Sequence, residues 1–358
     1  MNRRTLRTTA RVLAPALVAV CLWSSPSPAA EYWLCAGRTT KTMPDPDGPG
    51  PLRGQLISMW GFALDNNQNL ADGCGGPPRV PGPALVVPDG DATGLTVHLR
   101  NDLPLLNRRP VRVSLFIPGQ AAGTAGAPAG AFFTDAQGRQ RARSFTVETP
   151  RGGVRTYTWP GFKPGTYLYM SGTHPALQVQ MGLYGMARRD AAPGTAYAGV
   201  PYDQQVTLLY SEIDPALHRA VRLNLYGPSP RMSIHSTLKY RPTYFLVNGK
   251  PFAKGVTPNI PAGVAGSTTL IRFLNAGLQS HVPVIQGAYV RLVAEDGNPA
   301  RYPIEQYSVL LPAGKTVDAL FTPGNPGVYP IHDRRLSLTN SLQTPGGLLS
   351  FLEVGAQP

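Results

Sequence analysis

Cysteine and histidine are scarce in this chain of 358 residues, which contains 3 Cys and 6 His. Cys21 lies in an apolar stretch near the N-terminus, so only Cys35 and Cys74 remain in the rest of the chain. No CxxC pair, no Cys-His spacing of the zinc type and no HExxH motif is present. A GxSxG nucleophile elbow and a phosphate-binding glycine loop are missing as well. The sequence therefore offers no support for the common zinc, serine-hydrolase or nucleotide-binding sites.

Long hydrophobic runs are equally scarce, and the most extended one is Val12–Trp23. Four arginines precede it, and small residues and prolines follow it up to Ala30. This order is typical of a secretory signal peptide over residues 1–30, and the run is too short for a transmembrane helix. The pair Arg3-Arg4 keeps a twin-arginine route open beside the general secretory (Sec) route. We expect a periplasmic or extracellular mature chain with no transmembrane segment.

Acidic residues are outnumbered, and the formal net charge is +13. The basic residues are scattered in pairs such as Arg108-Arg109 and form no basic helix with interleaved aromatics. We therefore expect no nucleic-acid partner. A solvated basic surface and a weak attraction to an acidic envelope partner are the two interpretations that remain.

Long stretches free of glycine and proline are also rare, because the chain holds 39 Gly and 38 Pro. Few windows can therefore carry a regular helix. Short β-branched segments stand between these residues and predict an all-β sandwich. Examples in the first half are 95–99, 111–117 and 156–159, and in the second half 244–248, 270–274, 307–311 and 317–321. One short helix is expected over 214–225, with Asp214 as its cap, and a long loop over 120–137.

The two halves of the chain echo each other. Gly165-Thr-Tyr-Leu-Tyr169 is similar to Gly327-Val-Tyr-Pro-Ile331, and each is followed at nearly the same spacing by a second Gly-rich motif. This repetition predicts two copies of one β-sandwich. We place the first domain at 31–195 and the second at 196–358, with the boundary in a stretch rich in Ala, Gly and Pro.

Several motifs in the correct order resemble the multicopper oxidase family. The strongest is Gly165–Gly185, which is similar to the family's copper-binding strand, and others are 81–104, 245–249, 272–277 and 311–318. The resemblance covers about 80–350 and matches the first two domains of that family. It implies two tandem cupredoxin-like Greek-key β-sandwich domains.

The family's copper ligands are mostly missing. The resemblance places one His-x-His pair within Val111–Gly119, which has no histidine, and another at Met170 and Gly172. If the second half is compared with the terminal domain of a two-domain member, His332-Asp333-Arg334 stands where His-Cys-His belongs. A type 1 copper site needs a cysteine thiolate, and a trinuclear cluster needs paired histidines. Whether the chain is an enzyme stays open, and a self-sufficient oxidase is not expected.

One soft copper site remains conceivable from the residues. Met170, His174 and Met181 lie on or beside the altered strand, and thioether and imidazole groups suit Cu(I). The alternative is that Met170 fills a core and that His174 is a turn residue. His281 and His332 are weaker candidates. We expect no function for His98, on a strand face, for His218, on the helix, or for His281, at the edge of a loop.

Cys35 and Cys74 form an even pair in an exported chain, which favours a disulfide over two metal thiolates. The bond would close a loop of about 40 residues, contribute roughly 3–4 kcal/mol and fasten the segment 31–51, which we expect to be rich in loops.

Two hypotheses of function follow from these observations. The first is an exported multicopper-oxidase-like protein that binds copper weakly and has an accessory role in envelope redox or metal chemistry, with a redox partner. The second is a non-catalytic secreted binding or scaffold module. A homo-oligomer is open in both cases.

Overall fold

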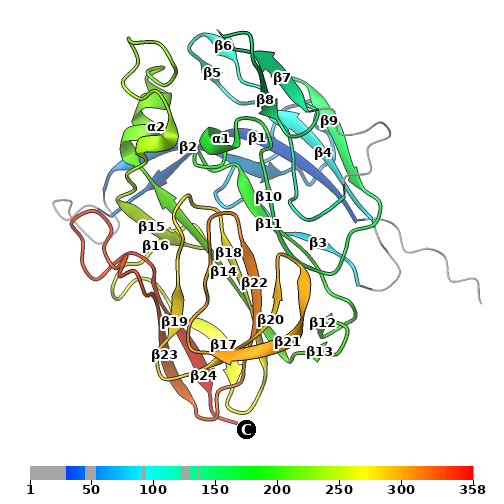
Figure 1. Cartoon of the computed structure of the whole chain (residues 1–358), viewed down its shortest axis with the longest axis vertical. Coiled ribbons are helices and arrows are strands. Elements are labelled where there is room, and N and C mark those ends of the chain that lie inside the picture. Colours follow the sequence, from blue (N-terminus) through cyan, green and yellow to red (C-terminus); the bar gives the residue numbers. More distant parts are fainter. Residues whose placement is uncertain (1–29, 45–53, 90–93, 122–129, 136, 358) are drawn as a thin grey trace, which may run out of the picture.

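A computed structural model describes residues 30–44, 54–89, 94–121, 130–135 and 137–357. These residues form two stacked β-sandwiches, and chain order runs from the upper one to the lower one in Figure 1. The predicted signal peptide, residues 1–30, lies outside the described residues except for Ala30. No helix of the described part combines the length and apolar character that a membrane crossing requires.

The first sandwich contains the strand that resembles the copper motif. Its core lies between two sheets and includes Leu34, Trp60, Leu99, Tyr169 and Ala187. One sheet has the order β2 (Leu56–Leu64), β1 (Ala30–Thr42), β4 (Leu95–Asn101) and β9 (Val154–Trp159), and the other has the order β10 (Gly165–Met170), β11 (Tyr184–Arg189) and β3 (Leu85–Val87).

The second sandwich has a core that includes Leu208, Phe273, Val317, Ile331 and Leu352. The larger sheet has the order β16 (Lys250–Pro251), β15 (Tyr244–Val247), β14 (Gln204–Ile213), β18 (Thr269–Asn275), β22 (Thr316–Phe321), β20 (Val290–Glu295) and β21 (Asn298–Gln306). The sheet facing it has the order β17 (Ile260–Val264), β24 (Leu349–Gly355), β23 (Gly327–Asp333) and β19 (Pro283–Ile285).

The two sandwiches repeat one strand topology. In the first, β1 pairs parallel with β4, and β4 pairs antiparallel with β9. In the second, β14 pairs parallel with β18, and β18 pairs antiparallel with β22. The echoed segments occupy equivalent places, because β10 and β23 each pair antiparallel with the next strand of their sheet, β11 and β24. The sequence repeat therefore corresponds to a structural repeat. The boundary at 195–196 stays a prediction.

The remaining elements are short, and they correct part of the sequence analysis. A hairpin of β7 (Ala131–Thr134) and β8 (Gln140–Ser144) occupies part of the segment predicted to be a loop. Segments 111–117 and 307–311 join their neighbours only through isolated bridges and are not strands, because prolines and a glycine interrupt the pairing on their flanks. Other short elements are β5 (Leu105–Leu106), β6 (Arg109–Pro110), β12 (Thr195–Tyr197), β13 (Val200–Pro201), α1 (Pro175–Gln178) and η1 (Thr237–Lys239).

Helix α2 (Pro215–Arg222) confirms the expected helix and joins the two halves. The Asp214 carboxylate caps it by accepting hydrogen bonds from the backbone N–H groups of Ala216 and Leu217. The helix follows β14 of the second sandwich, but Leu217 and Val221 pack into the core of the first. It lies beside β2 in the upper part of Figure 1.

The predicted disulfide is present between Cys35 and Cys74, whose Cα atoms are 5.2 Å apart. Both sulfur atoms are used in this bond, so neither is available as a metal thiolate. The segment 31–51 was expected to be rich in loops, and this was wrong for its first part, because Ala30–Thr42 is a continuous strand. Residues 45–51 lie outside the described residues. Pairing with β2 on one side and β4 on the other satisfies its backbone and outweighs its glycine and polar residues.

Candidate functional site

The end of β10 lies at the centre of the region that resembles the copper motif. The Met170 N–H donates to the Phe116 carbonyl (2.9 Å), and the Phe116 N–H donates to the Met170 carbonyl (2.8 Å). This bridge joins the two segments that the resemblance predicts to carry His-x-His pairs. The structure therefore brings the two segments together as the resemblance implies, with other side chains in place of histidines.

Hydroxyl groups occupy the space between these segments. The Thr173 hydroxyl oxygen lies 3.0 Å from that of Ser114 and 3.1 Å from that of Ser144, and the two serine oxygens are themselves 3.0 Å apart, so the three hydroxyls form one hydrogen-bonded group. All three residues are buried. A Cβ atom added at Gly172 would lie 3.0 Å from the Ser114 hydroxyl oxygen and 3.1 Å from the Phe116 Cβ. These mutually hydrogen-bonded neutral oxygens do not suit a trinuclear copper cluster, which requires imidazole nitrogens, and the close packing leaves no room for it.

The three residues predicted to hold a soft copper ion do not share one environment. Met170 packs against an apolar cluster between the two halves that includes Met59, Val179 and Leu246. Met181 is buried in the core of the first sandwich. His174 is exposed and precedes helix α1. The alternative that Met170 fills a core matches its position, and Met181 is a core residue as well. Joint copper binding by the three residues stays an untested prediction.

His281 has surroundings very different from the expected loop edge. Its side chain is completely buried, with Nδ1 3.0 Å from Asp333 Oδ2 and Nε2 2.7 Å from Glu212 Oε1. Burial alone would lower the pKa of His281, but the two carboxylates outweigh it and raise that pKa. His281 does lie at the edge of the loop between β18 and β19, but its burial was not expected, because its partners come from β14 and β23, far away in the sequence. Asp333, at the position compared with the type 1 cysteine, therefore binds a histidine through a hydrogen-bonded ion pair. His332 is adjacent but half-buried and outside this group.

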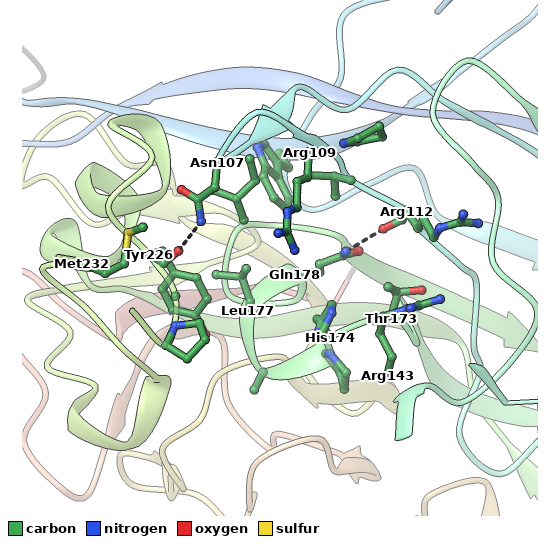
Figure 2. A pocket seen from close by; sticks show the side chains of 18 of the residues that line it. Asn107, Arg109, Arg112, Arg143, Thr173, His174, Leu177, Gln178, Tyr226 and Met232 are labelled. Atoms are coloured by element: carbon green, nitrogen blue, oxygen red, sulfur yellow. Dashed lines mark hydrogen bonds between the residues drawn. The ribbon is translucent and has the colours of Figure 1, made fainter. Parts of the chain in front are cut away.

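An open pocket of about 800 Å³ lies beside the hydroxyl cluster (Figure 2). One wall is the β5–β6 hairpin, another is α1 with His174 and Thr173, and a third is the loop after α2. Two hydrogen bonds fix the hairpin to that loop, since the Asn107 side chain donates to the Tyr226 carbonyl (2.7 Å) and the Asn107 N–H donates to the Asn224 side chain (2.8 Å). The Gln178 side chain donates to the Arg112 carbonyl (2.7 Å) and fixes α1.

Three arginines line this pocket, and no Asp or Glu is among its described lining residues. Glu148 lies behind the wall, where the Arg143 guanidinium donates to it at 3.0 Å and 2.5 Å. Arg112 lies 4.0 Å from the same carboxylate. Arg109 has no ion pair or side-chain hydrogen bond with another described residue, and Figure 2 shows its guanidinium directed toward Gln178 and His174. The pocket therefore has an excess of positive charge.

His174 reaches the pocket in a neutral state. Although the side chain is partly exposed, desolvation by the surrounding wall lowers its pKa, the nearby Glu148 opposes this effect, and the charge of Arg143 adds to it. An imidazole whose pKa is below the usual value near 6.5 is mostly uncharged at neutral pH. His174 can therefore donate or accept one hydrogen bond in the pocket without adding charge.

Sequence reasoning did not identify the other pocket residues. Arg109 was visible only as half of a basic pair, and the residues 226–232 were visible only as a proline-containing loop. The pocket forms because α2 carries that loop across to the first sandwich. No local pattern in the sequence indicates this contact.

Comparisons with known proteins support the fold. Residues 228–348 match the family model "Multicopper oxidase". The blue copper oxidase from Nitrosomonas europaea has a TM-score of 0.65 at 19% identity, over 90% of this chain and 85% of that one. The copper nitrite reductase from Nitrosomonas europaea has a TM-score of 0.58 at 19% identity, and the match covers 90% of this chain and 93% of that one. The multicopper oxidase mgLAC has a TM-score of 0.64 at 20% identity, and the match covers 90% of this chain and 86% of that one. No curated protein matches the chain. The cupredoxin-like fold expected from the sequence is therefore confirmed.

Proposed function

We propose that this chain, a divergent relative of the multicopper oxidases, is an exported binding protein that uses the pocket between β6, α1 and the 226–232 loop. The observation that carries this proposal is the contrast between two neighbouring places. The hydroxyl cluster fills the space where the family's histidine pairs would stand, whereas the adjacent pocket is open and has fixed walls. An open pocket is therefore available for binding directly beside the hydroxyl cluster, which occupies the place of the family's histidine pairs.

Independent oxidase activity does not fit the donor atoms that are present. Ser114, Ser144 and Thr173 present neutral hydroxyls, and Asp333 is committed to His281. Among the described residues, the only group of three or more His, Cys, Asp and Glu donors close enough to share an ion is Cys35, Cys74 and Asp102. Two of these are the disulfide sulfurs. The similar solved structures are named as copper proteins, and that property is not transferred to this chain's hydroxyl cluster.

Weak copper binding with an accessory envelope role is the second candidate function. The observation in its favour is that His174 shares the pocket with the thioether of Met232, and that desolvation lowers the pKa of His174, which favours its neutral form. Neutral imidazole and thioether are ligands that suit Cu(I). Under this proposal, only His174 of the three predicted residues Met170, His174 and Met181 would bind copper, and Met232 would supply the thioether.

Elemental analysis of the mature protein, purified from the compartment where it accumulates, separates the two candidates. The binding-protein proposal predicts less than one copper per chain, no intense blue absorption, and retention of a small organic molecule seen by native mass spectrometry. Stoichiometric copper that is lost in His174→Ala would instead support the accessory copper role. A full cytoplasmic location would contradict both. An envelope partner or a homo-oligomer, both proposals from the sequence, can be tested by cross-linking and light scattering on the same material.

A further inference from the structure

The pocket has two chemically different ends. Arg143 and His174 lie at the polar end, toward which Arg109 is directed, and Tyr226 and Met232 lie at the opposite end (Figure 2). Trp60, Leu106 and Leu177 add further apolar surface to the wall. Figure 2 shows Leu177 and Tyr226 between Met232 on one side and His174 on the other. A ligand that fills the pocket must therefore satisfy positive charge at one end and cover apolar surface at the other.

The charge balance of the polar end specifies the sign of the ligand. Glu148 neutralises one guanidinium, that of Arg143, with which it forms a bidentate pair. Its contact with Arg112 is much longer, at 4.0 Å. Arg109 and Arg112 are left with an excess positive charge. Arg109 is the guanidinium directed into the pocket, and it has no described acidic partner. A guanidinium presents paired donors that match the oxygens of a carboxylate, sulfonate or phosphate.

The size of the pocket excludes a simple inorganic anion as the ligand that fills it. A volume of about 800 Å³ lies within the range of roughly 300–1,000 Å³ that small organic ligands occupy. The walls are fixed by the hydrogen bonds of Asn107 and Gln178, so the cavity does not need to be assembled when a ligand arrives.

We infer that the pocket binds a small organic anion whose single acidic group contacts Arg109 and whose aromatic or aliphatic body lies against Leu177, Tyr226 and Met232. This inference rests on the proposed binding function and adds the chemical class of the ligand. His174 supplies one neutral hydrogen bond beside the acidic group. Recognition of negative charge alone is not sufficient, because apolar side chains such as Leu177, Tyr226 and Met232 also line the pocket.

Two fluorescent probes that differ in one group test the inference. Anilinonaphthalene sulfonate is an aromatic anion, and phenylnaphthylamine has the same rings without the sulfonate. We expect Arg109→Ala to weaken sulfonate-probe binding about ten-fold or more, since a hydrogen bond to a charged group contributes about 1.5–3 kcal/mol. The same substitution should change binding of the neutral probe less than about two-fold, because its apolar contacts are kept.

Arg108→Ala is the matched control. Arg108 is the adjacent exposed arginine and is absent from the pocket wall, and its substitution removes the same charge. Tyr226→Ala should weaken both probes, whereas Tyr302→Ala, at an exposed tyrosine on β21, should weaken neither. A naphthalene carboxylate should displace the sulfonate probe, and inorganic phosphate at equal concentration should not. Thermal unfolding of each variant verifies that the fold is kept.

The outcomes separate the inference from the proposed function. Equal affinity for both probes, with no effect of Arg109→Ala, overturns the ligand class while Tyr226-dependent binding still supports the binding function. Binding of neither probe, or binding indifferent to Tyr226→Ala, overturns both. Displacement by inorganic phosphate as effective as by the aromatic carboxylate overturns the need for an apolar body.

Discussion

Nδ1 of His281 lies 3.0 Å from Oδ2 of Asp333, and both side chains are completely buried. Hydrogen bonds from His281 and from the Val282 N–H lower the pKa of Asp333, although burial alone would raise it. Glu212 adds a second carboxylate on the opposite nitrogen of the ring. The two acidic side chains raise the pKa of the buried histidine and therefore favour its imidazolium form.

This arrangement predicts a specific dependence of stability on pH. The folded pKa of His281 is raised, so its contribution to the free energy of unfolding is complete below the unfolded value of about 6.5 and is lost as pH rises through the folded pKa. His174 and His218 have lowered pKa values and act in the opposite direction. We therefore expect the difference between the original chain and His281→Gln, measured by urea unfolding, to shrink as the pH is raised from 6 to 8 and beyond. A difference that stays constant over this range would contradict the imidazolium assignment.

Removal of one carboxylate should be costly. Asp333→Asn leaves the His281 charge with one partner in a water-free site, and breaking a buried ion pair costs about 3–5 kcal/mol. His332→Asn is the control, because this neighbour is half-buried and outside the group. The measurement is again the free energy of unfolding in urea. Equal stability of the two variants would show that the buried pair contributes little.

The close packing at Gly172 gives a second test of the hydroxyl cluster. A Cβ there would be 3.0 Å from the Ser114 oxygen, so Gly172→Ala should destabilise the chain by about 1–3 kcal/mol. Gly161→Ala is the matched control, because no atom lies within 4 Å of the Cβ position at Gly161. Thermal unfolding of both variants measures the difference. A tolerated Gly172→Ala would mean that the segment can move apart and that room for a larger group exists.

Arg272 provides a test of how the halves are joined. Its guanidinium is fully buried, donates to Asp190 (2.5 Å) and Thr166 (2.9 Å) of the first half, and comes from β18 of the second. Arg272→Met should destabilise the chain by about 3–5 kcal/mol, because Asp190 loses its buried partner. We expect the double variant with Asp190→Asn to recover part of this loss. Additive losses in the two variants would contradict direct pairing.

The disulfide should contribute measurably as well. Replacement of both Cys35 and Cys74 by serine should lower the free energy of unfolding by about 3–4 kcal/mol, as expected for a bond that spans 39 positions of the sequence. A thiol titration of the unfolded, unreduced mature protein should detect no free thiol from this pair. Detection of two free thiols would contradict the bond.

Much of the fold could be predicted from local patterns. Glycine and proline spacing, together with the repeat at Gly165 and Gly327, indicated two similar sandwiches, and Asp214-Pro215 indicated the helix start. His281 could not be placed in this way, because its burial depends on Glu212 and Asp333, which are 69 and 52 positions away. The missing copper ligands were visible as substitutions. What replaced them, the hydroxyl cluster and the Arg109 pocket, depends on side chains brought together only by the tertiary fold.

Helix α2 has a further consequence for the pocket. The helix belongs to the chain of the second sandwich, is buried in the core of the first, and carries Tyr226 and Met232 to the pocket wall. A ligand that touches both this loop and Arg109 binds only when the two halves are docked. By thermodynamic linkage its binding energy adds to the cohesion between the halves. Ligand binding in the pocket should therefore slow the exchange of backbone amide hydrogens along the whole interface between the two sandwiches, including positions far from the pocket.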